Sequence, residues 1–343
     1  MRHPRTVFVA LCFAVSLLAT VVPPQVLAQP ASPSAGSDLE ANEALVLRYY
    51  ELFNRGSFDA MPEIFAPDFA LQIVPPGEDA GLSGLIAGIE EVRIGLPDLT
   101  IDVNDLFAEG NMVVARTTIR GTHLGDFFGV PPTGTVVQTE AIDLWQVVDG
   151  KLTANWHLED ILGIMQQVGM MPSGGAAATS VAPGLDATPA AAGAAANPAT
   201  IEEQKALARR FYAEIFERGD VAVADEILTP DFVWHNQVPP GPAGVKTFAT
   251  EMRTAFPDLR LTAEHVVAEG DRVAILWTLS GTHQGEFFGV PATGQRVMIP
   301  GLDIYRIDNG KIAELWTVGD DLSLLAQLGA IPGFGDDAAT PAA

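Results

Sequence analysis

The sequence predicts an α+β fold built twice along one chain, each copy a curved sheet wrapped over N-terminal helices. The first observation is a long repeat, in which GTHLGDFFGVPPTG at residues 121–134 returns as GTHQGEFFGVPATG at residues 281–294. The second is the order within each copy, because segments with helical periodicity come first and extended segments follow. The third is a pair of dipeptides typical of two-residue hairpin turns, Asp149-Gly150 and Asn309-Gly310.

The repeat fixes the expected domain organisation. Its offset of 160 residues persists through most of each copy, and two copies are too few for a solenoid, so the pattern indicates a duplicated domain. We predict one domain at residues 38–172 and a second at 200–332. Residues 173–199 are rich in Ala, Gly and Pro and almost uncharged, which predicts a disordered linker, and residues 333–343 resemble them and predict a flexible tail.

The elements of each copy follow from apolar spacing and turn residues. In the first copy, residues 38–55 have the spacing of an amphipathic helix that ends at Gly56. A short helix, a strand at 69–74 and another helix are expected next. Four extended runs follow, at residues 99–108, 112–123, 135–148 and 152–159, and a short helix at 161–168 closes the copy. The second copy repeats this order, with its first strand at 232–237 and its closing helix at 321–328.

The first 28 residues have the pattern of a secretory signal peptide. A short basic start precedes an apolar run at residues 7–22, and Val26-Leu27-Ala28 resembles a small-residue cleavage site. A retained anchor is the alternative, but Pro23 and Pro24 end the run short of the roughly 20 residues that span a bilayer. We therefore expect a secreted or extracytoplasmic protein. The only cysteine, Cys12, lies in this leader, so no disulfide is expected in the mature chain.

The strong negative charge limits the classes of partner. The formal net charge is −24 at pH 7, and a surface this acidic repels phosphate backbones and anionic lipid. Nucleic acid and membrane surfaces are therefore not expected as partners. No metal site is expected either, because the sequence has no H-x-x-x-H motif, no cysteine pair and no clustered carboxylates at ligand spacing.

The words of the two copies, taken in order, resemble one family. YYELFNRG, PDF, GTHxGxFFGVPxTG, the hairpin DGK or NGK, and W-x-x-x-D leading into LGIMQQVG or LSLLAQLG are similar to the SnoaL-like polyketide cyclase (ester cyclase) family of the nuclear transport factor 2-like superfamily. The resemblance implies two tandem cone-shaped domains, each with a sheet curled round a deep apolar pocket. It also implies an intramolecular aldol ring closure that needs no metal or cofactor.

The resemblance carries candidate site residues with it. A carboxylate at the end of the last long strand would act as general acid/base, which maps onto Asp160 and Asp320. Polar groups of the preceding strand map onto Gln146 and Arg306, and those at the end of the first strand map near Gln72 and His235. Trp234, beside His235, is expected at a pocket mouth, although a solvent-exposed loop histidine is the alternative.

Strand alternation gives an independent reason for choosing these aspartates. Trp316, Val318 and Asp320 share one strand face, as do Trp156, Leu158 and Asp160. If that face lines the pocket, both tryptophans contact the substrate, and the desolvated carboxylate has a raised proton affinity that suits acid/base chemistry. The alternative is helix capping, because each aspartate directly precedes a short helix.

Two further groups of residues have alternative interpretations. His123 and His283 end a long strand in the repeated word and are either pocket residues or part of the architecture that closes one end of each cone. The same alternation predicts that four residues lie on the outer face of the sheet: Asp143, Trp145, Asp303 and Tyr305. That face either pairs the two copies as an internal pseudo-dimer or is exposed to water.

Two functions are consistent with the sequence. The first is a cofactor-free enzyme that cyclises, isomerises or hydrolyses a small apolar carbonyl or ester compound, with Asp320 and Asp160 as acid/base groups. The second is a secreted binding protein that holds an apolar small molecule without chemistry. The fold alone does not separate them.

Overall fold

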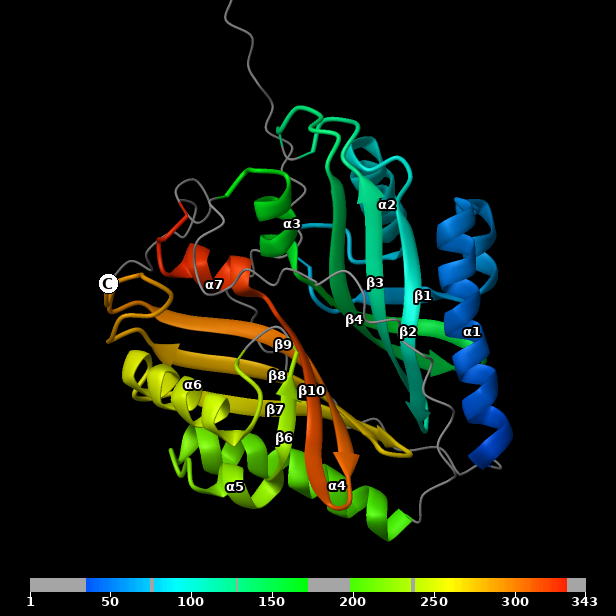
Figure 1. The fold of residues 1–343 in the computed structure, drawn as a ribbon. Coiled ribbons are helices and arrows are strands. Elements are labelled where there is room, and N and C mark those ends of the chain that lie inside the picture. Colours follow the sequence, from blue (N-terminus) through cyan, green and yellow to red (C-terminus); the bar gives the residue numbers. More distant parts are fainter. Residues whose placement is uncertain (1–34, 75–76, 128, 172–197, 236–237, 332–343) are drawn as a thin grey trace, which may run out of the picture.

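The computed structural model describes residues 35–74, 77–127, 129–171, 198–235 and 238–331 (Figure 1). The predicted leader and the tail at 333–343 lie outside these residues. So does the predicted linker except for its last two residues, because helix α4 already begins at Pro198. Within the described ranges, no helix is both long enough and apolar enough to cross a membrane.

Within the described residues, the first domain contains four helices and five strands in the order that the sequence predicts. These are α1 (Ala35–Arg55), the 3₁₀ helix η1 (Phe58–Glu63), β1 (Phe65–Leu71), α2 (Leu82–Gly95), β2 (Thr100–Glu109), β3 (Met112–Thr122), β4 (Val136–Val148), β5 (Lys151–Glu159) and α3 (Ile161–Gln167). The second domain follows the same plan. It comprises α4 (Pro198–Arg210), the π-helical η2 (Phe211–Glu217), α5 (Val223–Ile227), β6 (Leu228–Trp234), α6 (Pro242–Ala255), β7 (Arg260–Glu269), β8 (Arg272–Thr282), β9 (Arg296–Asp308), β10 (Lys311–Gly319) and α7 (Asp321–Gln327).

Each domain has one five-stranded mixed sheet, which confirms the predicted α+β class. The strand orders are β1-β5-β4-β3-β2 and β6-β10-β9-β8-β7. The first strand of each sheet pairs in parallel with the last, and the other pairs are antiparallel. The predicted hairpins are present, since Asp149 and Gly150 have φ of 50° and 69°, as the mirror-image turns that join twisted strands require.

The first strand of each sheet begins four residues earlier than predicted. β1 starts at Phe65 and includes Pro67, and its pairing with β5 is irregular between Phe65 and Ala70. An edge strand tolerates proline because the missing N–H faces away from the ladder. The strand therefore extends back through Pro67 to Phe65.

The concave face of each sheet packs on the helices of its own domain. In the first domain, Trp145 of β4 contacts Tyr49 of α1 with ring centroids 4.6 Å apart and lies in the same core cluster as Phe53 and Phe69. Tyr305 occupies the corresponding place in the second domain, 5.7 Å from Phe211 of η2.

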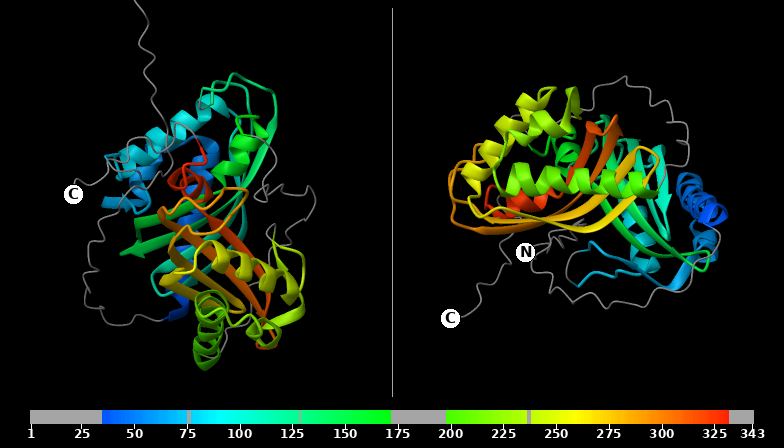
Figure 2. Two further views of the ribbon diagram at one scale, coloured as in Figure 1. Left: turned by 90° about the vertical axis from the view of Figure 1, so that its left-hand side faces the viewer. Right: turned by 90° about the horizontal axis from the view of Figure 1, so that it is seen from below.

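The opposite faces of the two sheets pack against each other. A third apolar cluster draws side chains from both domains. Its buried members are Phe107, Val114, Ile142, Leu144, Leu158, Val267, Ala274, Leu276, Leu302, Ile304, Trp316 and Val318. Figures 1 and 2 show the second domain lying along the sheet of the first.

Polar contacts at the edge of this interface are nearly reciprocal. Glu109 accepts a hydrogen bond from the backbone N–H of Ala268 at 2.9 Å, and Glu269 accepts one from Ala108 at 2.8 Å. The guanidinium of Arg116 also lies 4.8 Å from the centroid of the Trp316 ring. Both β2 and β7 are thus held by carboxylates of the other domain.

This packing corrects the predicted orientation of the central strands. Asp143, Trp145, Asp303 and Tyr305 were expected on the outer face, but all four point into their own domain and are buried. The expected pocket residues Trp156 and Trp316, with Val318, belong instead to the inter-domain cluster. Leu158 belongs to this cluster and also lines a cavity of the first domain. The prediction was wrong because both sheet faces are buried, so apolar alternation does not indicate which face lines the pocket.

Candidate functional site

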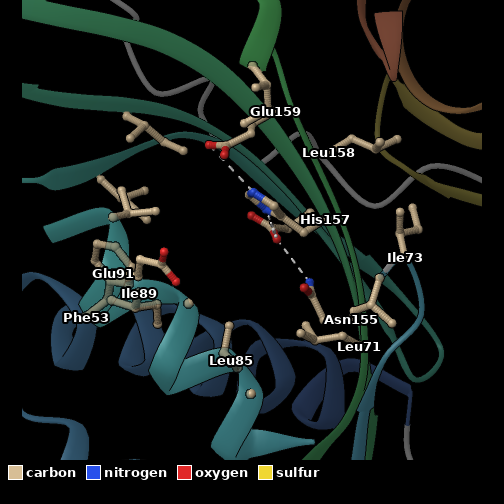
Figure 3. A pocket seen from close by; sticks show the side chains of 18 of the residues that line it. Phe53, Leu71, Ile73, Leu85, Ile89, Glu91, Asn155, His157, Leu158 and Glu159 are labelled. Carbon is tan, nitrogen blue, oxygen red and sulfur yellow. Dashed lines mark hydrogen bonds and ion pairs between the residues drawn. The ribbon is translucent and has the colours of Figure 1, made fainter. Parts of the chain in front are cut away.

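A cavity of about 350 Å³ lies inside the first domain, between its sheet and helices α1 and α2 (Figure 3). Its wall is mainly apolar. The apolar lining includes Phe53, Leu71, Ile73, Leu85, Ile89, Val92, Leu96, Ile119 and Phe127. This volume is in the range of small-molecule sites that surround an apolar ligand and orient it with a few polar groups.

Four polar side chains of the cavity wall come from strands β4 and β5, and others, among them Glu91 and Asp320, come from elsewhere. β5 contributes Asn155, His157 and Glu159, which share one face because side chains alternate along a strand. β4 contributes Asp143, which pairs directly with His157 across the antiparallel ladder. Figure 3 shows His157 between Glu159 and Asn155, and Glu91 of α2 on the opposite wall.

Asp143 is the centre of a buried hydrogen-bond network. Its Oδ1 lies 2.9 Å from Nδ1 of His157 and accepts from the side-chain amide of Asn155 at 3.0 Å. Its Oδ2 accepts from the hydroxyl of Tyr50 at 2.8 Å, and Trp145 donates to that hydroxyl at 3.3 Å. With only 3% of its surface exposed, this carboxylate is fixed by its donors and orients the imidazole ring.

His157 is held between two carboxylates. Its Nδ1 faces Asp143, and its Nε2 lies 3.8 Å from Oε2 of Glu159. Burial disfavours the charged ring, but the charge and hydrogen bond of Asp143, together with Glu159, outweigh burial and raise the pKa of His157 to about 10. The ring is therefore an imidazolium at neutral pH, with Nδ1 directed at Asp143 and Nε2 directed at Glu159.

The tyrosines beside this network remain neutral. Burial, reinforced by the charge of Asp143, raises the pKa of Tyr50 well above its usual value, and the pKa of Tyr49 is raised for the same reasons. Tyr50 therefore acts as a hydrogen-bond donor to Asp143 and not as a base. Among the described residues, no group of three His, Cys, Asp or Glu side chains is arranged to hold a metal ion.

The second domain lacks most of this polar set. At the 160-residue offset, Leu315 stands for Asn155, Thr317 for His157 and Gly319 for Glu159. Only the aspartate of β4 is retained, as Asp303. The second copy therefore has no imidazole and no second strand carboxylate at this place.

Large aromatic residues fill the second cavity, which measures only about 90 Å³. Trp277 replaces Thr117 of the first copy and donates to Asp303 at 3.0 Å, while Tyr212 and Tyr305 donate to the other carboxylate oxygen. Burial raises the pKa of Asp303 in spite of these donors. The network has become part of a packed core.

The aspartates chosen from the sequence both cap helices. Asp160 accepts from the backbone N–H of Gly163 at 2.7 Å at the start of α3, and Asp320 accepts from Ser323 at 3.0 Å at the start of α7. Asp160 is not among the lining residues of either cavity. Asp320 lies against the cavity of the first domain and not against that of its own.

The other candidates lie mostly outside the cavities. Trp234 lines the second cavity and donates to Thr317 at 2.9 Å. His235 stacks on Trp316 with ring centroids 4.5 Å apart and lies 2.9 Å from Glu314, which also accepts from Arg306. The hydrogen bonds from His235 and Arg306 outweigh burial and lower the pKa of Glu314 to about 2.

The remaining candidates have structural contacts. Gln146 accepts from Thr153 at 3.1 Å near the hairpin. His123 and His283 are completely buried, with Nδ1 at 2.9 Å from Thr133 and 3.1 Å from Thr293 respectively, and neither is among the cavity-lining residues.

Sequence reasoning missed His157, Asn155 and Glu159 as site residues. The available signal was the contrast between the copies, since three polar residues alternate in NWHLED and none is retained in LWTVGD. Polar residues at alternate positions of a strand share one face, so this pattern could have indicated the face that carries the polar groups of the site.

One protein-family model matches both copies of the repeat. The model of the SnoaL-like polyketide cyclase family matches residues 43–168 and 206–328, together more than half of the chain. Aklanonic acid methyl ester cyclase of Streptomyces peucetius is 28% identical over 130 residues, which is 36% of this chain and 88% of that protein. Nogalonic acid methyl ester cyclase of Streptomyces nogalater is 27% identical over 124 residues, covering 34% of this chain and 89% of that protein.

Both cyclases are therefore similar in length to a single copy of the repeat. Among solved structures, TsrD from Streptomyces laurentii is 29% identical, with a TM-score of 0.36, and the match covers 40% of this chain and 99% of that one.

The filled cavity of the second domain generates a stability prediction. Trp277 pairs with Gly301 across the ladder, and a Cβ at Gly301 would collide with the indole ring, whereas the first domain pairs Thr117 with Ala141. We expect Gly301→Ala to destabilise the protein by about 1 to 3 kcal/mol through overpacking. In a Trp277→Thr background the same change should cost little. Urea unfolding of the wild type, the two single variants and the double variant measures the coupling between the two positions. An equal loss of unfolding free energy in both backgrounds would show that the Trp277 ring does not occupy the space beside Gly301.

The imidazolium generates a pH prediction. The pKa of His157 is raised from 6.5 to about 10 in the folded state, so the folded protein binds more protons than the unfolded chain between these values. This contribution to stability is full below pH 6.5 and is lost as the pH rises towards 10. We expect the unfolding free energy of the wild type to fall more steeply over that window than that of His157→Asn. Parallel slopes in urea titrations at several pH values would show that His157 is not the group responsible.

Proposed function

Because this chain belongs to the SnoaL-like polyketide cyclase family, we propose that its first domain is an acid/base enzyme acting on a small apolar carbonyl or ester compound. The second domain is proposed as its non-catalytic partner in an internal pseudo-dimer. The observation that carries this proposal is the His157–Asp143 pair in a cavity of about 350 Å³, which has no counterpart in the cavity of the second domain.

The geometry suits a reaction in which a carbonyl oxygen gains negative charge. His157 is protonated at neutral pH, and its Nε2–H lies on the side of Glu159, away from Asp143. A donor aimed at a developing oxyanion in an apolar site stabilises the transition state more than it would in water. Asp143 is the positioning residue, because it holds the ring through Nδ1.

Glu159 is the proposed base. Its carboxylate lies 3.8 Å from Nε2 of His157, so the acid and the base sit at one end of the same apolar cavity. In a ring closure by aldol addition, Glu159 takes the proton from the carbon next to a carbonyl, and the resulting carbanion forms the new C–C bond. His157 gives a proton to the carbonyl oxygen that becomes the alcohol. Proton transfer from Glu159 to His157 then restores both groups.

The relatives indicate the class of substrate. The two curated relatives are named as cyclases of aklanonic acid methyl ester and nogalonic acid methyl ester. We propose an apolar ring compound with carbonyl and ester groups for this chain as well. The apolar residues of the cavity wall favour such a compound, because they would cover the hydrocarbon part of a ligand.

Proton exchange at carbon tests the acid/base proposal without the natural substrate. In D₂O, the wild-type protein should accelerate exchange of the α-protons of 2-tetralone, a compact apolar ketone, as followed by NMR. His157→Asn and Asp143→Asn should each slow the protein-dependent exchange by about 10²-fold or more, the usual contribution of general acid/base catalysis.

Asp303→Asn is the matched control, because it alters the corresponding aspartate in the filled cavity and should leave exchange near the wild-type rate. If His157→Asn exchanges the probe as fast as the wild type while its fold is intact, the protein is a binder of apolar small molecules and not an acid/base catalyst.

We also propose export of this protein, on the pattern of residues 1–28. When it is produced with its full leader in a host that has a general secretory pathway, the exported form should begin at residue 29. N-terminal sequencing checks the cleavage, and an intact N-terminus on protein that stays inside the cells would refute export.

A further inference from the structure

The second domain contributes to the core and cavity of the first. Helix α7 lies beside α3 (Figure 1), and Leu322 and Ile331 of the second domain belong to the apolar core cluster of the first domain. Asp320, the residue that caps α7, lines the 350 Å³ cavity together with Ile161 and Ile164. The cavity is therefore lined in part by Asp320, which lies more than 150 positions further along the sequence than the other lining residues.

Asp320 has one oxygen that its capping role does not use. Oδ1 accepts the hydrogen bond from Ser323, whereas Oδ2 is buried and finds no donor among the residues that the structure describes. The whole residue is only 8% exposed. Leaving a buried polar oxygen without a partner costs free energy, and such an atom beside a cavity is accounted for when a ligand supplies the missing hydrogen bond.

The surroundings of Asp320 also suit a hydrogen bond with a ligand. Burial raises the pKa of its carboxyl to about 7, although the hydrogen bonds from Ser323 act in the opposite direction. Asp321 is raised to about 7 as well, by burial and by the charges of Asp160 and Asp320. Around neutral pH the carboxyl can therefore accept from a hydroxyl group or donate to an oxygen.

The two domains are not equivalent in this respect. Asp160 caps α3 as Asp320 caps α7, but Asp160 is not among the residues that line the second cavity. The position after each aspartate differs too, since Ile161 faces the first cavity and Asp321 the second. The capping role is thus common to both, and the cavity position belongs to Asp320 alone.

We infer that Asp320 is a ligand-binding residue supplied by the second domain, whose free Oδ2 binds a hydroxyl group on an apolar ring compound in the cavity of the first. This inference rests on the proposed function in one respect, in that it takes the first-domain cavity as the ligand site. The second domain then has a direct part in the site, beyond covering the outer sheet face.

The test separates the role of the unpartnered Oδ2 from that of the capping Oδ1. Asp320→Ser keeps a capping oxygen for α7 and removes Oδ2, and Asp160→Ser makes the same change at α3. The probes are 2-tetralol and tetralin, which share one ring system and differ in the hydroxyl group. Titrations followed by NMR give the dissociation constant of each probe for the wild type and both variants, and thermal unfolding shows whether the folds are intact.

We expect Asp320→Ser to weaken 2-tetralol about tenfold and tetralin less than twofold, while Asp160→Ser leaves both near the wild-type values. Equal weakening of the two probes, or equal effects of the two substitutions, would reduce Asp320 to a helix cap and overturn the inference. Failure of the wild type to bind either probe would also count against it.

The binding test of Asp320 and the exchange test of His157 can fail independently of each other. If Asp320→Ser loses its preference for 2-tetralol but His157→Asn keeps the α-proton exchange, the cross-domain binding role stands and the acid/base role fails. If exchange depends on His157 but Asp320→Ser behaves as Asp160→Ser does, the enzyme proposal stands and this inference fails.

Discussion

The burial of both faces of each sheet is the constraint on which the rest of the structure depends. Along β4 and β5, one set of alternate residues enters the inter-domain cluster and the other set faces the helices of its own domain. Leu144 and Trp156 belong to the first set, and Asp143 and His157 to the second. Close packing of one face thus fixes the strands that carry the polar groups of the other, which is how a scaffold holds a site rigid.

The duplicated domain has kept its architecture in both copies and its polar cavity in one. The outer-face positions are apolar in both domains, because each must bury itself against the other. The inner-face positions differ, since Leu315, Thr317 and Trp277 fill the space that is open in the first domain. In the filled cavity, Asp303 accepts hydrogen bonds from three aromatic side chains and from Thr317, so its carboxylate is satisfied without a ligand.

The sequence predicted the fold class, the duplication and the hairpins, because these depend on local signals and on the repeat. It did not predict the side chains of the site. Alternation separates the two faces of a strand, but when both faces are buried it does not show which one lines the cavity and which one packs against the other domain. Trp316 and Trp156 were therefore assigned to the wrong face. Asp160 and Asp320 were predicted as site residues because each follows the last strand of its copy. The structure shows that each is also the N-cap residue of the next helix. The position of Asp320 beside the first cavity depends on inter-domain packing, which neither copy specifies by itself.

The reciprocal contacts of Glu109 and Glu269 join two units that are encoded separately within one polypeptide. In an assembly of two identical subunits, every change in a gene appears on both sides of the symmetry axis, so a residue cannot be lost from one side and kept on the other. Tandem fusion removes that restriction. One half therefore carries His157 and its neighbours while the other carries packing residues at the same positions, and each half can change under its own selection.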